Sequence, residues 1–187
     1  RDLLVGSVGG ARLYADLYHA ARGTAPITPF LEDALILAQA FAWNSAFNLN
    51  VRALRLRPRP FVYGDAAPAR ERNKPEAAGA VYSGHASAAF LGAVYVSTVY
   101  PLRHQDFERT GWLWAGSLAA ATGVAALRVA AGKHFPGDVL AGAAMGSLIG
   151  YGFVQLHLGG NALWGWSAAP WLTTDGAPGI AAVRRLR

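Results

Sequence analysis

The sequence predicts an all-α fold, a helical bundle of about five to six helices that forms a single domain over residues 1–187. A chain of this length suits one domain with one sizeable core. Its apolar runs are dominated by Ala and Leu and carry little strand signal, so helix is the better interpretation of most segments. Pro and Gly residues separate these runs at spacings typical of helices.

The first third of the chain is expected to form two helices. Residues 2–22 can form the first, although three glycines weaken its beginning. The second is expected from about Leu31 to Leu56, and Pro58 follows it as a stop signal. Glu32 and Asp33 would then lie in its first turn, where acidic groups complement the helix dipole.

The rest of the chain is expected to contain one long loop, three helices and a tail. Residues 61–82 are rich in Pro, Gly, Ala and charge, and a loop of this length is typically functional or disordered. Helices are expected over Ala86–Leu102, over Thr110–Val129, and from Pro136, a favourable first-turn residue, to about His157. The tail over residues 158–187 has no clear period and is expected to be irregular.

The balance of apolar and charged residues leaves the relation to a membrane open. Hydrophobic residues make up 53% and charged residues 15%, and the mean hydropathy is +0.22, which lies between soluble domains and chains made mostly of membrane helices. Four stretches without charge approach the length of a bilayer span: 34–51, 86–102, 110–127 and 139–156. Because most of them are rich in small residues, core helices of a compact soluble bundle would look the same.

The charges favour a small anionic partner over a nucleic acid. The net charge is +6, and all but two of the 17 basic residues are Arg, whose planar fork binds carboxylate or phosphate. A genome that prefers Arg codons would give the same total. The basic residues are spread out and form no patch interleaved with aromatics, so no nucleic acid is expected as a partner. The absence of cysteine excludes disulfides and thiolate metal sites.

The start of the chain carries neither Met nor a signal peptide. Because it begins at Arg1, we expect either that a leader was removed or that the sequence was trimmed. We expect an extracytoplasmic location, periplasmic or membrane-associated, with which the absence of cysteine is compatible. The sequence does not indicate an oligomeric state.

Three separated segments carry residues suited to chemistry. They are the arginine-rich run Arg52–Pro60, the segment Tyr82–His85 and the segment Arg128–Asp138. Taken singly, each has a structural interpretation. Arginines at a helix end complement the dipole, a serine before an apolar run caps a helix, and a histidine and an aspartate four residues apart form a surface pair.

Taken together, the segments supply the parts of a phosphoryl-transfer site. Arg52, Arg59 and Arg128 provide fixed positive groups for the non-bridging oxygens of a phosphate. Ser83 and Gly84 lie just before an expected helix, where backbone N–H groups and the dipole favour an anion. Gly84 also lets the backbone approach the anion closely, because it has no side chain.

Two histidines and one aspartate supply the reacting groups. Asp138 follows His134 at a separation that lets its carboxylate reach one imidazole nitrogen, which leaves the other as a nucleophile toward phosphorus. His85 would protonate the leaving oxygen. No metal is expected, because positioning and electrostatics dominate phosphoryl transfer. The sequence also has no H-E-x-x-H motif, clustered carboxylates or P-loop.

These segments resemble the motifs of the type 2 phosphatidic acid phosphatase (PAP2) superfamily, which also contains bacterial class A acid phosphatases and vanadium-dependent haloperoxidases. The family pattern is Lys-x6-Arg-Pro, then Pro-Ser-Gly-His, then Ser-Arg-x5-His-x3-Asp. The chain follows it in order and spacing, and the resemblance covers a motif core of roughly residues 30–157. It departs from the pattern at Arg52, which replaces Lys, at Tyr82, which replaces Pro, and at Leu127, which replaces Ser. The last two are expected to change the shape of the pocket edge.

The resemblance implies a metal-independent phosphatase that hydrolyses phosphomonoesters, with lipid phosphates or diphosphates as candidate substrates, through a phosphohistidine intermediate. It implies His134 as the nucleophile, Asp138 as its orienting partner and His85 as the general acid. The phosphate would be held by Arg52, Arg59, Ser83, Gly84 and Arg128. The expected partner is a phosphorylated small molecule or lipid, and no cofactor is expected.

Two alternatives to a phosphatase stay open. The first is a vanadium-dependent haloperoxidase on the same scaffold, with vanadate bound in the phosphate site as a mimic of the transition state. Arg52 counts against it, because haloperoxidase sites resemble the Lys form of the motif and the two side chains differ in donor geometry. The second is a non-catalytic membrane or scaffold protein with a degenerate site.

Overall fold

A computed structural model describes residues 27–64, 67–159, 166–172 and 178–184, and the structural statements below concern these residues. In chain order the elements are α2 (Thr28–Ala53), the 3-10 turn η1 (Pro60–Tyr63), the short helix α3 (Ala69–Arg72), the 3-10 turn η2 (Pro75–Ala78), α4 (Gly84–Arg103), α5 (Thr110–Ala130), α6 (Pro136–His157), β1 (Trp166–Leu172) and β2 (Pro178–Arg184).

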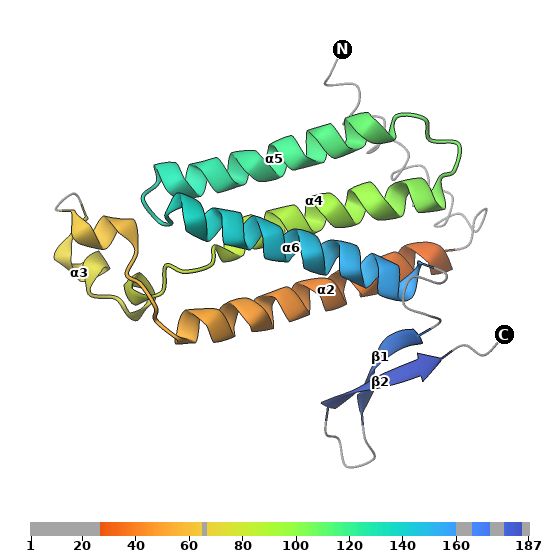
Figure 1. Ribbon diagram of the computed structural model, residues 1–187, viewed down its shortest axis with the longest axis horizontal. Coiled ribbons are helices and arrows are strands. Elements are labelled where there is room, and N and C mark those ends of the chain that lie inside the picture. Colours follow the sequence, from red (N-terminus) through yellow and green to blue (C-terminus); the bar gives the residue numbers. More distant parts are fainter. Residues whose placement is uncertain (1–26, 65–66, 160–165, 173–177, 185–187) are drawn as a thin grey trace.

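The long helices α2, α4, α5 and α6 lie side by side as a bundle, with α3 at one end (Figure 1). The predicted all-α bundle is therefore confirmed, and the bounds of α4, α5 and α6 lie within two residues of the predicted ones. Helix α2 begins at Thr28, so Glu32 and Asp33 lie beyond its first turn, contrary to our expectation. The helix expected over residues 2–22 lies outside the described residues.

Two segments that were expected to be irregular carry local structure. The loop over residues 61–82 contains most of η1 together with α3 and η2. In the tail, β1 pairs with β2 in an antiparallel hairpin that places Trp166 opposite Arg184. Pro170, inside β1, hid this strand from sequence reasoning, because proline cannot donate a hydrogen bond to a ladder and argues against a strand.

Glycines bring α6 against the backbone of α4. A Cβ atom at Gly146 would lie 2.0 Å from the carbonyl oxygen of Ser87, and similar clashes with α4 and its N-cap, at 2.5 and 2.6 Å, would arise at Gly142 and Gly150. Small residues at this four-residue spacing let two helix backbones approach closely. The contacts run in the same order along both helices, so α4 and α6 are parallel and begin at the same end of the bundle.

Two buried apolar clusters stabilise the bundle through the area they remove from water. The first joins α2, α4 and α6 through Ile36, Tyr95, Val99 and Val154. The second joins α4, α5 and α6 and has the partly buried Phe90 and Val129 packed against Ala86, Ala125 and Val139. The second cluster includes Ala86, which lies in the first turn of α4.

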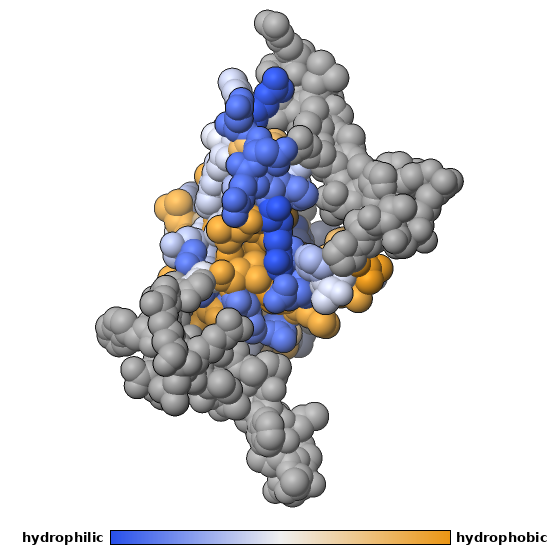
Figure 2. Space-filling model, turned by 90° about the vertical axis from the view of Figure 1, so that its right-hand side faces the viewer, coloured by the Kyte–Doolittle hydropathy of each residue, from blue (hydrophilic) through white to orange (hydrophobic). Residues whose placement is uncertain are grey.

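The opposite end of the bundle is closed by charged pairs between α2 and α4. Arg103 donates to Glu32 and to Asp33, each at 2.6 Å, and the hydroxyl of Tyr95 donates to the backbone oxygen of Asp33 at 2.6 Å. The two acids expected to complement the helix dipole therefore serve as cross-links to α4. Figure 2 looks onto this end of the bundle and shows a band of hydrophilic residues with hydrophobic residues beside it.

Candidate active site

The candidate site lies where α4 and α6 begin and where α2 and α5 end (Figure 1). Arg52 lies in the last turn of α2 and Arg128 in the last turn of α5. Ser83 is the N-cap of α4, and His134 lies just before α6. The topology thus brings the three sequence segments to one end of the bundle.

The start of α4 is fixed by Ser83 and Gly84. The Ser83 side chain is fully buried and accepts a hydrogen bond from the backbone N–H of Ala86 at 3.4 Å, as an N-cap does. Its own backbone N–H donates to the backbone oxygen of Asp138 at 2.9 Å, which joins α4 to α6. A Cβ atom at Gly84 would lie 2.8 Å from Oδ1 of Asn48, so a larger residue here would require the Asn48 side chain to shift.

Tyr82 precedes this segment and anchors it through buried hydrogen bonds. Its φ of 73° lies in the left-handed region, which is costly for a residue with a side chain and closed to the proline of the family pattern. Its hydroxyl donates to Oδ1 of Asn44 at 2.8 Å and shares a hydrogen bond with Oγ of Ser87 at 2.5 Å. The side chain is buried, and its expected effect on the shape of the pocket edge stays a prediction.

His134 is almost completely buried, with 4% of its surface exposed. Its Nδ1 lies 2.9 Å from the backbone oxygen of Ala80. Because a carbonyl only accepts hydrogen bonds, Nδ1 carries the proton and Nε2 of the neutral ring keeps its lone pair. Burial, together with the positive charges of Arg59 and Arg128, lowers the pKa of His134 to about 4. The ring therefore suits a nucleophile that is neutral above this pH.

Asp138 is placed differently from the expectation. Its Oδ2 accepts from the backbone N–H of Phe135 at 2.8 Å and so caps α6, and its Oδ1 forms an ion pair with Arg57. Nδ1 of His134 lies 3.8 Å from Oδ2, which is ion-pair distance but too long for a hydrogen bond. The acceptor at hydrogen-bond distance from Nδ1 is the carbonyl of Ala80, and the carboxylate of Asp138 is the more distant group.

The predicted phosphate-binding arginines surround His85 electrostatically. The pKa of His85 is lowered first by partial desolvation of the ring and then by the positive charges of Arg128, Arg59 and Arg52. Nε of Arg128 is buried and has no hydrogen-bond partner among the described residues, so it is a donor available to an anion. His85 itself is exposed, as a group that exchanges protons with water must be.

Sequence reasoning missed Arg57 and Ala80. Arg57 lies inside the arginine-rich run, but nothing in the spacing of that run distinguishes it from Arg55. Ala80 acts through its backbone carbonyl, which any residue would supply, so no side-chain pattern marks it. Only the fold, which brings residue 80 back to His134, reveals this contact.

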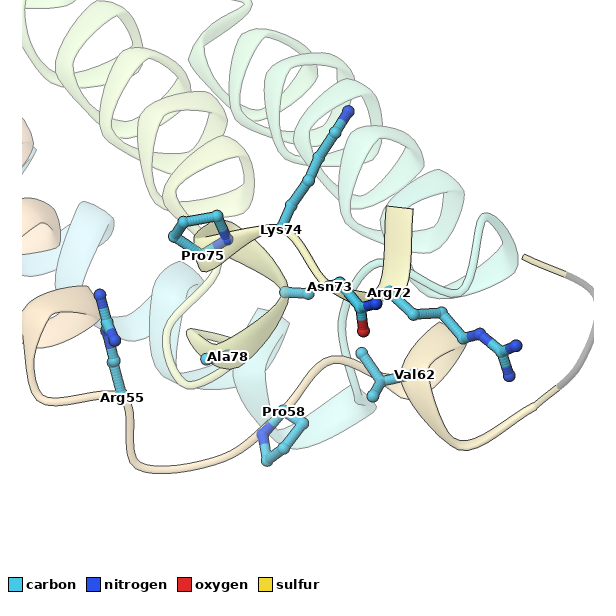
Figure 3. Close-up of a pocket in the computed structure, with 9 residues that line it drawn as sticks. Arg55, Pro58, Val62, Arg72, Asn73, Lys74, Pro75 and Ala78 are labelled. Carbon is cyan, nitrogen blue, oxygen red and sulfur yellow. The ribbon is translucent and has the colours of Figure 1, made fainter. Parts of the chain in front are cut away.

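A cavity of about 380 Å³ lies beside this end, between the turn after α2 and the segment from α3 to η2 (Figure 3). Three of its lining residues, Arg55, Arg72 and Lys74, are basic. Their charged ends do not converge in Figure 3: Arg72 donates to the backbone oxygen of Gly64 at 3.2 Å, and Lys74 pairs with Glu71 at 2.6 Å. None of the predicted site residues lines this cavity. Nowhere in the described part of the chain do three His, Asp or Glu side chains form a group that could hold a metal ion.

The family model of the PAP2 superfamily matches residues 33–161, which run from α2 to just beyond α6 and include all three motifs. The chain belongs to the PAP2 superfamily. No curated protein and no solved structure gives a significant match. Membership of the PAP2 superfamily supports a phosphatase or a related activity.

Proposed function

We propose that this PAP2 protein is a metal-independent phosphatase that hydrolyses phosphomonoesters through a phosphohistidine at His134. The observation that carries the proposal is the hydrogen bond from Nδ1 of His134 to the carbonyl of Ala80 at 2.9 Å, because it leaves Nε2 as a lone pair on a neutral ring. The positive charges of Arg59 and Arg128, which act on this ring, would balance the charge of a phosphate beside it.

The reaction has two steps with one proton carrier. Nε2 of His134 attacks phosphorus, the new P–N bond forms as the P–O bond to the leaving group breaks, and protonated His85 gives its proton to the leaving oxygen. Neutral His85 then takes a proton from water as its oxygen attacks phosphorus, the P–N bond breaks, and phosphate leaves. Arg52, Arg59 and Arg128 hold the non-bridging oxygens, while backbone N–H groups at the start of α4 favour the same anion.

The shifted histidines predict activity at acidic pH. His134 must be neutral to attack, and its pKa is lowered to about 4, so the rate should rise as the pH passes this value. His85 must be protonated, and its pKa is lowered from 6.5, so the rate should fall again as the pH rises through a value below 6.5. We expect a bell-shaped pH profile of kcat/KM whose two limbs report the coupled titration of His134 and His85. A rate that keeps rising above neutral pH would contradict these roles.

The direct test measures phosphate release in excess EDTA from wild type, His134→Ala and His104→Ala. His104 is the matched control, because it lies at the opposite end of the bundle, where it stacks on Tyr100 at 4.4 Å. We expect metal-free turnover in wild type and His104→Ala and none in His134→Ala. The two active proteins should also form a labelled phosphoprotein that is stable in alkali and labile in acid, and His134→Ala should not. EDTA-sensitive turnover that survives in His134→Ala would refute both the site and the absence of a metal.

Vanadate separates the phosphatase from the haloperoxidase alternative. We propose that vanadate binds at His134 as a mimic of the phosphoryl transition state and inhibits phosphate release. The guanidinium of Arg52, in place of the family Lys, supports a phosphatase over a peroxidase. Oxidation of bromide by peroxide in the presence of vanadate would favour the peroxidase. Failure to bind either phosphate or vanadate would favour a degenerate site.

We also propose that the protein acts on a lipid phosphate or diphosphate at a membrane, with its site outside the cytoplasm. Helices α5 and α6 are long and apolar enough to cross a bilayer by length and composition. They expose large apolar side chains, among them Leu127 at 69%, Leu140 at 69% and Leu148 at 65%, and exposed patches of this kind mark interaction surfaces.

Membrane fractionation tests the association, and a single introduced cysteine tests the side. Arg70→Cys places a thiol on the exposed α3 of a chain that has no cysteine of its own. An impermeant maleimide should label it in intact cells. Labelling only after lysis would contradict the extracytoplasmic location, and recovery of the protein without detergent from the soluble fraction would contradict the association.

A further inference from the structure

The backbone of Arg57 joins the loop after α2 to the segment that holds His134. Its carbonyl oxygen accepts from the backbone N–H of Ala80 at 2.8 Å, and a parallel bridge pairs it with Gly79. Two residues on, the N–H of Arg59 donates to the oxygen of Ala77 at 2.8 Å. These backbone hydrogen bonds fix the segment Ala77–Ala80, whose last residue supplies the carbonyl that binds Nδ1 of His134.

The side chain of Arg57 contacts Asp138 and Phe135, which follow His134 along the chain. Its Nη2 forms the ion pair with Oδ1 of Asp138, and its guanidinium lies over the ring of Phe135, 4.1 Å from the centroid. Asp138 is almost fully buried, so a carboxylate there needs a counter-charge. Arg57 therefore contacts both groups that compete for Nδ1 of His134, the backbone of Ala80 and the carboxylate of Asp138.

We infer that Arg57 is a positioning residue that decides which acceptor serves His134. It draws the Asp138 carboxylate onto its own guanidinium and fixes the Ala80 carbonyl on Nδ1, so that a neutral acceptor orients the nucleophile. The catalytic meaning of this arrangement rests on the proposed phosphatase function, whereas the arrangement itself does not.

The charges around His134 show what Arg57 changes. Asp138 of α6 favours the protonated ring, while Arg59 of the loop and Arg128 of α5 oppose it. His85, at the start of α4, is subject to the same arginines. Without Arg57, the Asp138 carboxylate would lie 3.8 Å from Nδ1 with its counter-charge removed, free to accept a hydrogen bond from the imidazolium.

The test is an NMR titration of the His134 ring in the full-length protein, with no substrate present. The variants are Arg57→Gln, Arg57→Gln/Asp138→Asn and the matched control Arg55→Gln, which removes an exposed charge from the same loop. Arg57→Gln should raise the His134 midpoint by about one unit or more. The double variant should cancel the rise, and Arg55→Gln should leave the midpoint unchanged. The acid limb of kcat/KM should move with the midpoint.

An unchanged midpoint in Arg57→Gln, or a rise that persists in the double variant, would overturn the inference. If Arg57→Gln does not fold, Asp138→Asn alone decides. Asp138→Asn should lower the midpoint by less than about one unit, because Arg57 already compensates the charge of the carboxylate, and a fall of about one unit or more would assign the orienting role to Asp138. Because the titration needs no turnover, a protein that releases no phosphate would refute the proposed function and leave this test standing.

Discussion

Two histidine-bearing segments lie at one end of the bundle, and different kinds of interaction hold them in place. Tyr82–His85, at the start of α4, is anchored by the buried neutral side chains of Tyr82, Asn44 and Ser87. His134–Asp138, at the start of α6, is anchored by a charged pair with Arg57 and by the carbonyl of Ala80. The first presents an exposed histidine and the second a buried one.

The difference matches the roles that we propose for the two histidines, a proton carrier for His85 and a nucleophile for His134. A proton carrier must reach water, so His85 can be exposed and its support needs no charge. A nucleophile must stay neutral and fixed in one tautomer, so His134 is buried and its ring is held by a carbonyl. Changes to the first support should therefore alter activity or stability without a pH signature, whereas changes to the second should move a titration.

The largest expected effect separates the two histidines by leaving group. His85→Ala should lower the rate by about 10²- to 10⁴-fold on an alkyl phosphate, whose leaving oxygen needs a proton. The loss in kcat/KM, which reports the first step, should be much smaller on a nitrophenyl phosphate, whose leaving group departs unprotonated. Hydrolysis of the phosphohistidine, in which His85 acts as the base, should slow equally for both substrates, so the comparison is made on kcat/KM. His134→Ala should abolish both reactions, as measured by phosphate release. Equal losses for both substrates in His85→Ala would mean that His85 does not carry the proton.

The next effect concerns the contact that keeps the two segments together. Gly146→Ala would place a Cβ atom 2.0 Å from the backbone oxygen of Ser87, so the helices must part, at a cost of about 1–3 kcal/mol or more. Gly152→Ala, in the same helix, meets nothing within 4 Å and should be neutral or stabilising. Denaturant unfolding measures both. Equal stability of the two variants would show that the spacing of α4 and α6 adapts freely.

Much of this comparison could be predicted from the sequence, and the rest depends on the fold. The helices and the residues of both segments follow from apolar runs, breakers and motif spacing. The supports do not: Ala80 acts through its backbone, and Tyr82 is defined by a φ of 73° that no composition reveals. The expected pairing of Asp138 with His134 assumed a free carboxylate, and Arg57 reaches it from 81 positions away along the chain.

The fold should lose stability in acid because of the second segment. The pKa of His134 is about 4 in the folded protein against an ordinary 6.5, so the unfolded chain binds the proton first as the pH falls. The stability from the buried neutral ring is complete above pH 6.5 and is lost toward pH 4, by up to about 3 kcal/mol. His134→Gln should flatten the decline in the free energy of unfolding between pH 7 and pH 4. An unchanged slope would mean that His134 opens to solvent in the folded state.

The smallest effect tests the neutral support of the first segment. Tyr82→Phe removes a hydroxyl that bonds to Asn44 and Ser87, and it should cost about 1–2 kcal/mol of unfolding free energy. The loss stays modest because Oγ of Ser87 still donates to Asn44 at 2.5 Å. Tyr151→Phe, at a half-exposed tyrosine of α6, should change stability little. Since no member of the network titrates between pH 4 and pH 7, the cost of Tyr82→Phe should be the same at both values. A cost that grows toward pH 4 would mean that the two supports are coupled through the bond between Ser83 and Asp138.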